Sequence, residues 1–91
     1  MTFTGEQLQA NLPEGWAGDE GGIWREFGFE SYAAGVAFAV EVALIAEKAD
    51  HHPDALVIGW KKVRVVYTTH SAGGVTSKDF AAARKVNAIS P

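Results

Sequence analysis

The feature that most constrains this chain is an apolar segment, residues 32–49, followed directly by Asp50-His51-His52-Pro53. Ser31 is a favourable N-cap, and a proline disfavours helical backbone at the residue before it. We therefore expect a helix over about 32–49 that ends at or just before the two histidines.

The apolar residues of this helix do not form a single stripe. One side carries Tyr32, Val36, Val40, Ala43 and Leu44, and another carries Phe38, Val42, Ile45 and Ala49. A helix that is apolar on most of its circumference is covered on most of it. We predict that one side packs on a sheet of the same chain and that the other is covered by a second copy, giving a homodimer or homotetramer through the 32–49 helix.

The rest of the chain alternates between short helical and extended patterns. Thr4, with Gln7 at capping-box spacing, opens a first helix, and Thr76-Ser-Lys-Asp79 opens the last one by the same pattern. Four strands are predicted, at 16–17, 23–29, 55–60 and 62–69, with a turn over 18–22 and His70 at the end of the last strand. Residues 1–91 thus predict one α+β domain, in the order α-β-β-α-β-β-α. It has a single four-stranded antiparallel sheet with three helices packed on one face.

Composition excludes several function classes. The 91 residues carry a net charge of −3, whereas a protein that binds nucleic acid directly usually has a basic face. Cysteine is absent, which excludes a disulfide framework, a thiol nucleophile and a zinc-thiolate site. The start lacks the features of a secretory signal, and the longest apolar run is too short to span a bilayer, so we expect a cytoplasmic protein without a membrane partner.

Three histidines, His51, His52 and His70, are the residues most suited to chemistry, because imidazole is easily poised near neutral pH. Carboxylates lie close by in sequence, at Glu47, Asp50, Asp54 and Asp79. This combination points to proton transfer. A metal site is disfavoured, because adjacent histidines at a helix end diverge and chelate one ion poorly.

Structural alternatives exist for the same residues. His51 and His52 can complement a helix C-terminus, Asp79 can cap the last helix, and Glu47 can be an i,i+4 partner of His51. Aromatic residues are core by default. Core is also the expected place for two tryptophans whose rings could otherwise stack on a flat ligand, Trp16 and Trp60.

The ordered set Glu47-x-x-x-His51-His52-Pro53, Trp60, Thr69-His70-x-Ala-Gly-Gly and Asp79 closely resembles the signature of pterin-4a-carbinolamine dehydratases. The resemblance extends to Gly15-Trp16, Phe27-x-Phe29 and Val42-Ala43-x-x-Ala46-Glu47-Lys48, and so covers essentially the whole chain. This family is also known as the dimerisation cofactor of a hepatic homeodomain transcription factor, and its members are dimers or tetramers.

The resemblance implies a cofactor-free and metal-free dehydration of a 4a-hydroxytetrahydropterin, a step in tetrahydrobiopterin recycling. It implies His51, His52 and His70 as catalytic residues and Glu47, Asp50, Pro53, Lys78 and Asp79 as binding or orienting residues. Ala55 stands where the family usually has an aromatic residue, residues 53–60 form a segment one residue longer than in many members, and Lys78 stands where arginine is frequent. The alternative is a non-catalytic binding module of the same fold, a coactivator or an assembly chaperone.

Overall fold

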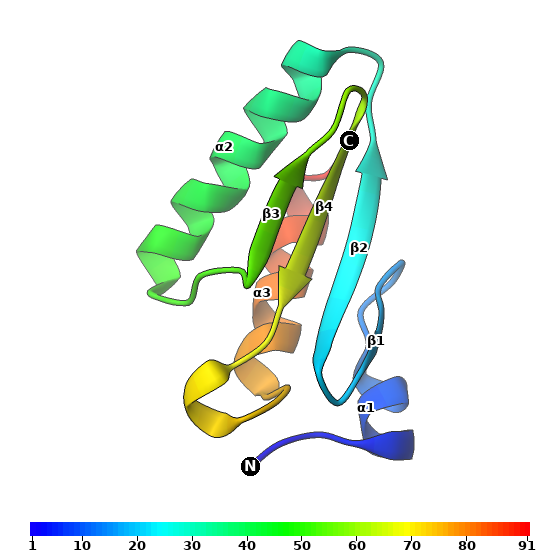
Figure 1. The fold of residues 1–91 in the computed structure, drawn as a ribbon, viewed down its shortest axis with the longest axis vertical. Helices are drawn as coiled ribbons and strands as arrows, with labels where there is room; N and C mark the ends of the chain where they lie inside the picture. The colour runs from blue at the N-terminus through cyan, green and yellow to red at the C-terminus, as the bar shows by residue number, and fades with distance from the viewer.

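The computed structural model describes residues 1–91 and has the predicted order α-β-β-α-β-β-α. Its helices are α1 (Gly5–Asn11), α2 (Tyr32–Ala49) and α3 (Ser77–Ile89), and its strands are β1 (Ala17–Asp19), β2 (Gly22–Gly28), β3 (Ala55–Ile58) and β4 (Lys62–Tyr67). A one-turn 3-10 helix, η1 (His70–Ala72), lies between β4 and α3. The four strands form one antiparallel sheet in the order β1-β2-β4-β3 (Figure 1).

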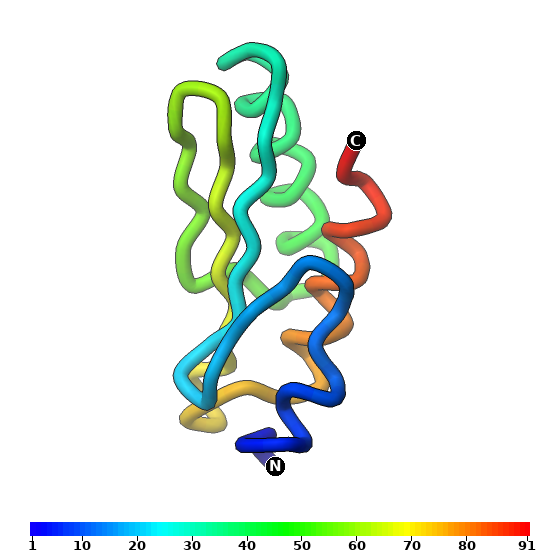
Figure 2. Tube along the Cα trace, turned by 90° about the vertical axis from the view of Figure 1, so that its right-hand side faces the viewer, coloured from blue at the N-terminus to red at the C-terminus, as the bar shows by residue number.

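All three helices lie on one face of the sheet, as predicted (Figure 2). The alternation along β4 explains this arrangement, because Val63, Val65 and Tyr67 are fully buried while Lys62 and Arg64 are exposed. The buried side chains of the sheet meet one apolar cluster supplied by the helices: Leu8 from α1, Phe38, Ala39 and Val42 from α2, and Phe80, Ala82, Ala83 and Val86 from α3. None of the helices is both long and apolar enough to cross a membrane.

Helix α2 begins and ends where the sequence predicts. The Ser31 hydroxyl accepts a hydrogen bond from the Ala34 N–H at 3.1 Å. At the other end Asp50 adopts a left-handed conformation, with φ 52°, and its N–H donates to the Glu47 carbonyl. The His51 N–H then reaches back to the Ala46 carbonyl at 3.1 Å. This pair of bonds is a Schellman motif, and it fixes His51 against the last turn of the helix.

One side of α2 stays uncovered within the chain. Tyr32, Val40 and Leu44 are 54%, 53% and 64% exposed, and they lie four or eight residues apart on the helix. We call these three residues the α2 stripe. Residues at this spacing share one face of a helix, so the α2 stripe is a continuous apolar row that points away from the sheet.

Some local predictions were wrong. Helix α1 begins after Thr4 as predicted, but the Thr4 side chain does not make the capping hydrogen bond that the capping-box spacing predicted. Strand β1 runs on to Asp19, through the first part of the predicted turn. Strand β4 ends at Tyr67, so His70 does not end a strand but begins η1.

Trp16 is buried as expected, whereas Trp60 and Trp24 lie outside the core. Strand β3 ends at Ile58, because the Gly59 N–H bonds the Lys62 carbonyl and closes a turn that carries Trp60 off the sheet. Trp60 is consequently 74% exposed, with the Lys61 ammonium 4.6 Å from its ring centroid. Trp24 is half-buried on the face of the sheet that no helix covers, where the Arg64 guanidinium lies 5.5 Å from its ring centroid.

Candidate active site

Each of the three histidines pairs with a different carboxylate. His51 Nε2 lies 2.7 Å from Asp79 Oδ1, His52 Nε2 lies 2.6 Å from Glu47 Oε1, and His70 Nε2 lies 2.6 Å from Asp54 Oδ1. Nδ1 of each ring has no partner within the chain. A carboxylate that accepts from Nε2 keeps the proton there and leaves Nδ1 free to accept or deliver a proton.

The pair between His51 and Asp79 is the buried one. The His51 side chain is 15% exposed and the Asp79 side chain 0%. Asp79 Oδ2 accepts from the Thr69 hydroxyl and from the Thr76 N–H, both at 2.8 Å. A buried carboxylate is costly unless its oxygens are hydrogen-bonded, and these three donors meet that need. Asp79 therefore both hydrogen-bonds His51 and completes the capping box of α3.

The other two pairs lie at the surface. Glu47 is the partner of His52 and not of His51. The His52 and Glu47 side chains are 56% and 76% exposed. The His70 and Asp54 side chains are 79% and 42% exposed. The second contact joins η1 to the loop before β3, which brings all three histidines to the end of the molecule where α2 and β4 finish (Figure 1).

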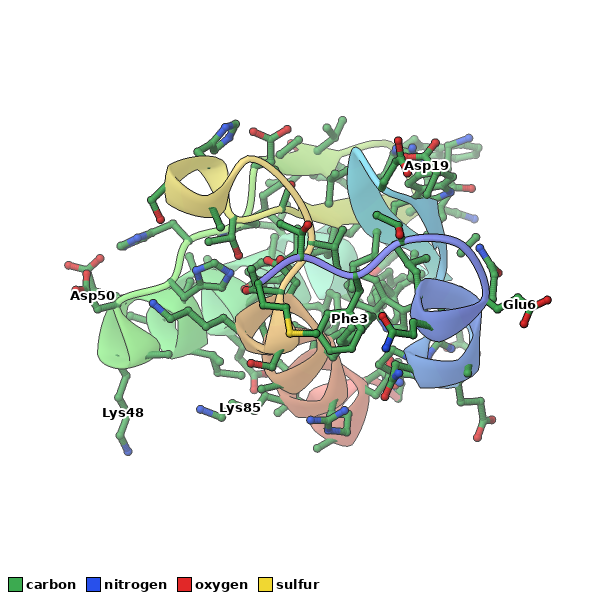
Figure 3. The ribbon with its side chains drawn as sticks, turned by 90° about the horizontal axis from the view of Figure 1, so that it is seen from below. Phe3, Glu6, Asp19, Lys48, Asp50 and Lys85 are labelled. Atoms are coloured by element: carbon green, nitrogen blue, oxygen red, sulfur yellow. The ribbon has the colours of Figure 1, made fainter.

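A cavity of about 200 Å³ lies between the last turns of α2 and the first turns of α3. Its apolar walls come from both helices: Ile45, Ala46 and Ala49 of α2, and Ala81 and Ala82 of α3. Its other borders are Asp50, His51, Tyr67, Lys78 and Lys85. Figure 3 views this end of the molecule, with Asp50 beyond the end of α2 and Lys85 on α3.

The cavity brings some predicted site residues together and leaves others apart. His51, Asp50 and Lys78 border it. His52 and His70 border none of the larger hollows in the structure. No group of three or more histidine, aspartate and glutamate side chains is placed to hold a metal ion.

Four residues shape this site through contacts that the sequence did not predict: Asp54, Tyr67, Thr69 and Thr76. Asp54 precedes a strand by one residue and gives no local sign that it reaches His70, sixteen residues later. Thr76 was visible only as a helix cap, although its hydroxyl also bonds the Thr69 hydroxyl at 2.8 Å. The alternation of β4 could have shown that Tyr67 is buried, but it could not show what the hydroxyl meets.

Tyr67 forms the floor beneath His51. The two rings are stacked, with centroids 5.5 Å apart and planes at 19°. Burial, and to a lesser extent the nearby Asp79 carboxylate, together raise the pKa of the Tyr67 hydroxyl to about 12. The phenol is therefore protonated at neutral pH and presents His51 with a neutral, flat surface.

Comparison with known proteins agrees with the ordered motifs. The sequence model of the family described as pterin 4 alpha carbinolamine dehydratase matches residues 1–89. A relative from Natronomonas pharaonis is 45% identical over 87 residues, covering 96% of this chain and 94% of its own. Another, from Rhodopseudomonas palustris, is 47% identical over 91 residues, covering 96% and 89%. Both carry the name pterin-4-alpha-carbinolamine dehydratase provisionally.

Two solved structures share the fold. A transcriptional coactivator/pterin dehydratase from Brucella melitensis is 34% identical, with a TM-score of 0.89 over the full length of both chains. A pterin dehydratase-like RuBisCO assembly factor of the α-carboxysome is 25% identical, with a TM-score of 0.66 over 80% of this chain and 83% of its own. Since the family model spans nearly every residue and the relatives align along most of their length, this chain belongs to the pterin 4 alpha carbinolamine dehydratase family.

Proposed function

We propose that this protein is a 4a-hydroxytetrahydropterin dehydratase. The observation that carries the proposal is the buried pair between His51 and Asp79, placed at the border of a cavity in a chain of this family. Such a pair supplies an oriented imidazole in a partly dry site, which is the arrangement that general acid–base catalysis requires.

The reaction needs two proton transfers and nothing else. A proton delivered to the hydroxyl on C4a lets it leave as water, while the N5 lone pair forms the new C=N bond. A base then takes the proton from N5, so the net proton count of the protein is unchanged, and proton exchange with solvent returns the acid and the base to their starting states. We assign these acid and base roles to His51 and His70, and to His52 a hydrogen bond to the substrate. Asp79, Asp54 and Glu47 hold the three rings.

The reaction as proposed uses no metal and no cofactor, so a strong chelator should leave turnover unchanged. Asp50, Pro53 and Lys78 are proposed as residues that bind or orient the substrate, and Asp50 and Lys78 border the cavity. We propose a cytoplasmic location, where tetrahydropterin recycling takes place, and no direct contact with nucleic acid.

The test is stopped-flow absorbance of enzymatically generated 4a-hydroxytetrahydropterin, with and without the protein. His51→Ala, His52→Ala and His70→Ala should each slow turnover, by about 10²-fold or more for the acid and the base, and each should stay folded. Arg84→Ala, an exposed change on the middle of α3, is the control and should have no effect. Wild-type turnover in all three histidine variants would exclude the assignment.

A second candidate function is a protein-binding module, since one solved relative is a transcriptional coactivator/pterin dehydratase and another is a RuBisCO assembly factor. The α2 stripe favours it, because exposed apolar rows usually mark interfaces. We propose that a second copy of this chain covers the stripe, as a dimer or tetramer. A protein that assembles but gives no stopped-flow acceleration would favour the binding module.

A further inference from the structure

Tyr67 carries the one buried side-chain polar atom in the structure that has no hydrogen-bond partner, its hydroxyl oxygen. The residue is fully buried at the end of β4. Buried hydroxyls are nearly always paired, because an unmade hydrogen bond costs free energy that an apolar side chain of the same shape would not. A phenylalanine would pack here without that cost. The presence of the hydroxyl therefore suggests a hydrogen-bond partner from outside the chain.

The position of Tyr67 indicates where such a partner would lie. Tyr67 borders the cavity between α2 and α3, next to His51, on which its ring is stacked. The hydroxyl oxygen has less than 1 Å² of exposed surface, so a ligand in the cavity reaches it only if neighbouring side chains move. Lys78 and Lys85 border the same cavity, and neither has a carboxylate within 4.0 Å to hold it. Both lysine side chains have long flexible stems, so they can move when a ligand enters the cavity.

The groups around the cavity select one chemical class of ligand. Alanine walls and the stacked His51 and Tyr67 rings suit a small flat ring. A protonated phenol presents a donor, for which a carbonyl oxygen is a strong acceptor. Asp50, with no cation within 4.0 Å, presents an acceptor at the border, as an amino-substituted ring needs. A small heterocycle with one ring carbonyl and an amino group matches this set.

We propose that the Tyr67 hydroxyl donates a hydrogen bond to the C4 carbonyl of a pterin bound in this cavity. C4 is bonded to C4a, so this bond places the reacting carbon beside His51. Tyr67 thereby determines specificity for 4-oxo rings over rings without that oxygen. The inference rests on the proposed dehydratase function, because it takes the pterin as the ligand.

The test compares the binding of pterin and of 2-aminopteridine, which lacks the oxygen at C4, by fluorescence titration. Tyr67→Phe should weaken pterin binding about tenfold, the usual effect of one lost hydrogen bond, and leave 2-aminopteridine binding unchanged. Arg84→Ala, an exposed change on α3 that does not border the cavity, should change neither. The unfolding midpoint of Tyr67→Phe should not fall, since the substitution removes an unpaired donor.

The outcomes separate this inference from the proposed function. An unchanged preference for pterin over 2-aminopteridine in Tyr67→Phe would overturn the inference. So would equal weakening of both ligands with a lowered unfolding midpoint, because that result assigns Tyr67 a packing role. Wild-type turnover decides the dehydratase proposal independently. A wild-type protein that binds pterin with the expected preference but does not dehydrate its substrate would overturn that proposal alone.

Discussion

One oxygen of Asp79 accepts from His51 Nε2 while the other accepts from the Thr76 N–H at the start of α3. A single buried carboxylate thus joins an imidazole at the end of α2 to the first turn of another helix. Substitutions at position 79 should therefore affect folding and turnover by separable amounts.

Asp79→Ala should lower the free energy of unfolding by about 2–4 kcal/mol, because it leaves the Thr76 N–H and the Thr69 hydroxyl without their acceptor. Asp79→Asn keeps an oxygen for those donors but turns an amide toward Nε2, which forces the other tautomer of His51. It should lose less stability than Asp79→Ala and still reduce turnover about 10²-fold. Urea unfolding and stopped-flow rates measure the two effects, with the exposed Glu41→Gln as control. Equal turnover in Asp79→Asn and wild type would contradict an orienting role.

Tyr67 should make the protein sensitive to alkali. Its pKa in the folded state, about 12, lies above the value near 10 of an unfolded tyrosine. The stability of the folded state is therefore unaffected by this ionisation below about pH 10. It falls as the pH rises toward 12, because the Tyr67 hydroxyl loses its proton in the unfolded chain first. The loss should reach about 2–3 kcal/mol in wild type, measured by urea unfolding across that range. Tyr67→Phe should not show this loss, whereas Tyr32→Phe should retain it.

Replacing Asp50 with glycine should make the protein more stable. It is the only non-glycine residue with positive φ, and glycine adopts this conformation without steric cost. Asp50→Gly should raise the free energy of unfolding by about 0.5–1 kcal/mol, and Asp50→Val should lower it by more. Thermal unfolding of the three proteins gives the comparison. A destabilised Asp50→Gly would show that the carboxylate itself holds the loop.

The α2 stripe should control assembly. Leu44→Glu places a charge within the proposed contact and should convert the dimer or tetramer to a monomer in light scattering at micromolar concentration. Arg84→Glu also adds a carboxylate to an exposed helix, and it should leave assembly intact. A monomeric wild type would refute the proposed interface.

The fold was predictable because its signals are local. Ser31 and Pro53 mark the two ends of α2, and the alternation of side chains from Val63 to Tyr67 indicates which face of β4 is buried. The contacts of the site were harder to predict from the sequence. The contact of Asp54 with His70 depends on the register of β3 against β4 and on η1, neither of which has a sequence signature. Trp60 was wrongly predicted to lie in the core, because a bulky apolar residue at the end of a strand cannot be told from one in the following turn by sequence alone.

The three imidazoles are hydrogen-bonded to carboxylates from three separate parts of the chain: α2 for His52, the loop before β3 for His70, and α3 for His51. No carboxylate is shared between two histidines, so a substitution that removes one pair leaves the partners of the other two histidines in place.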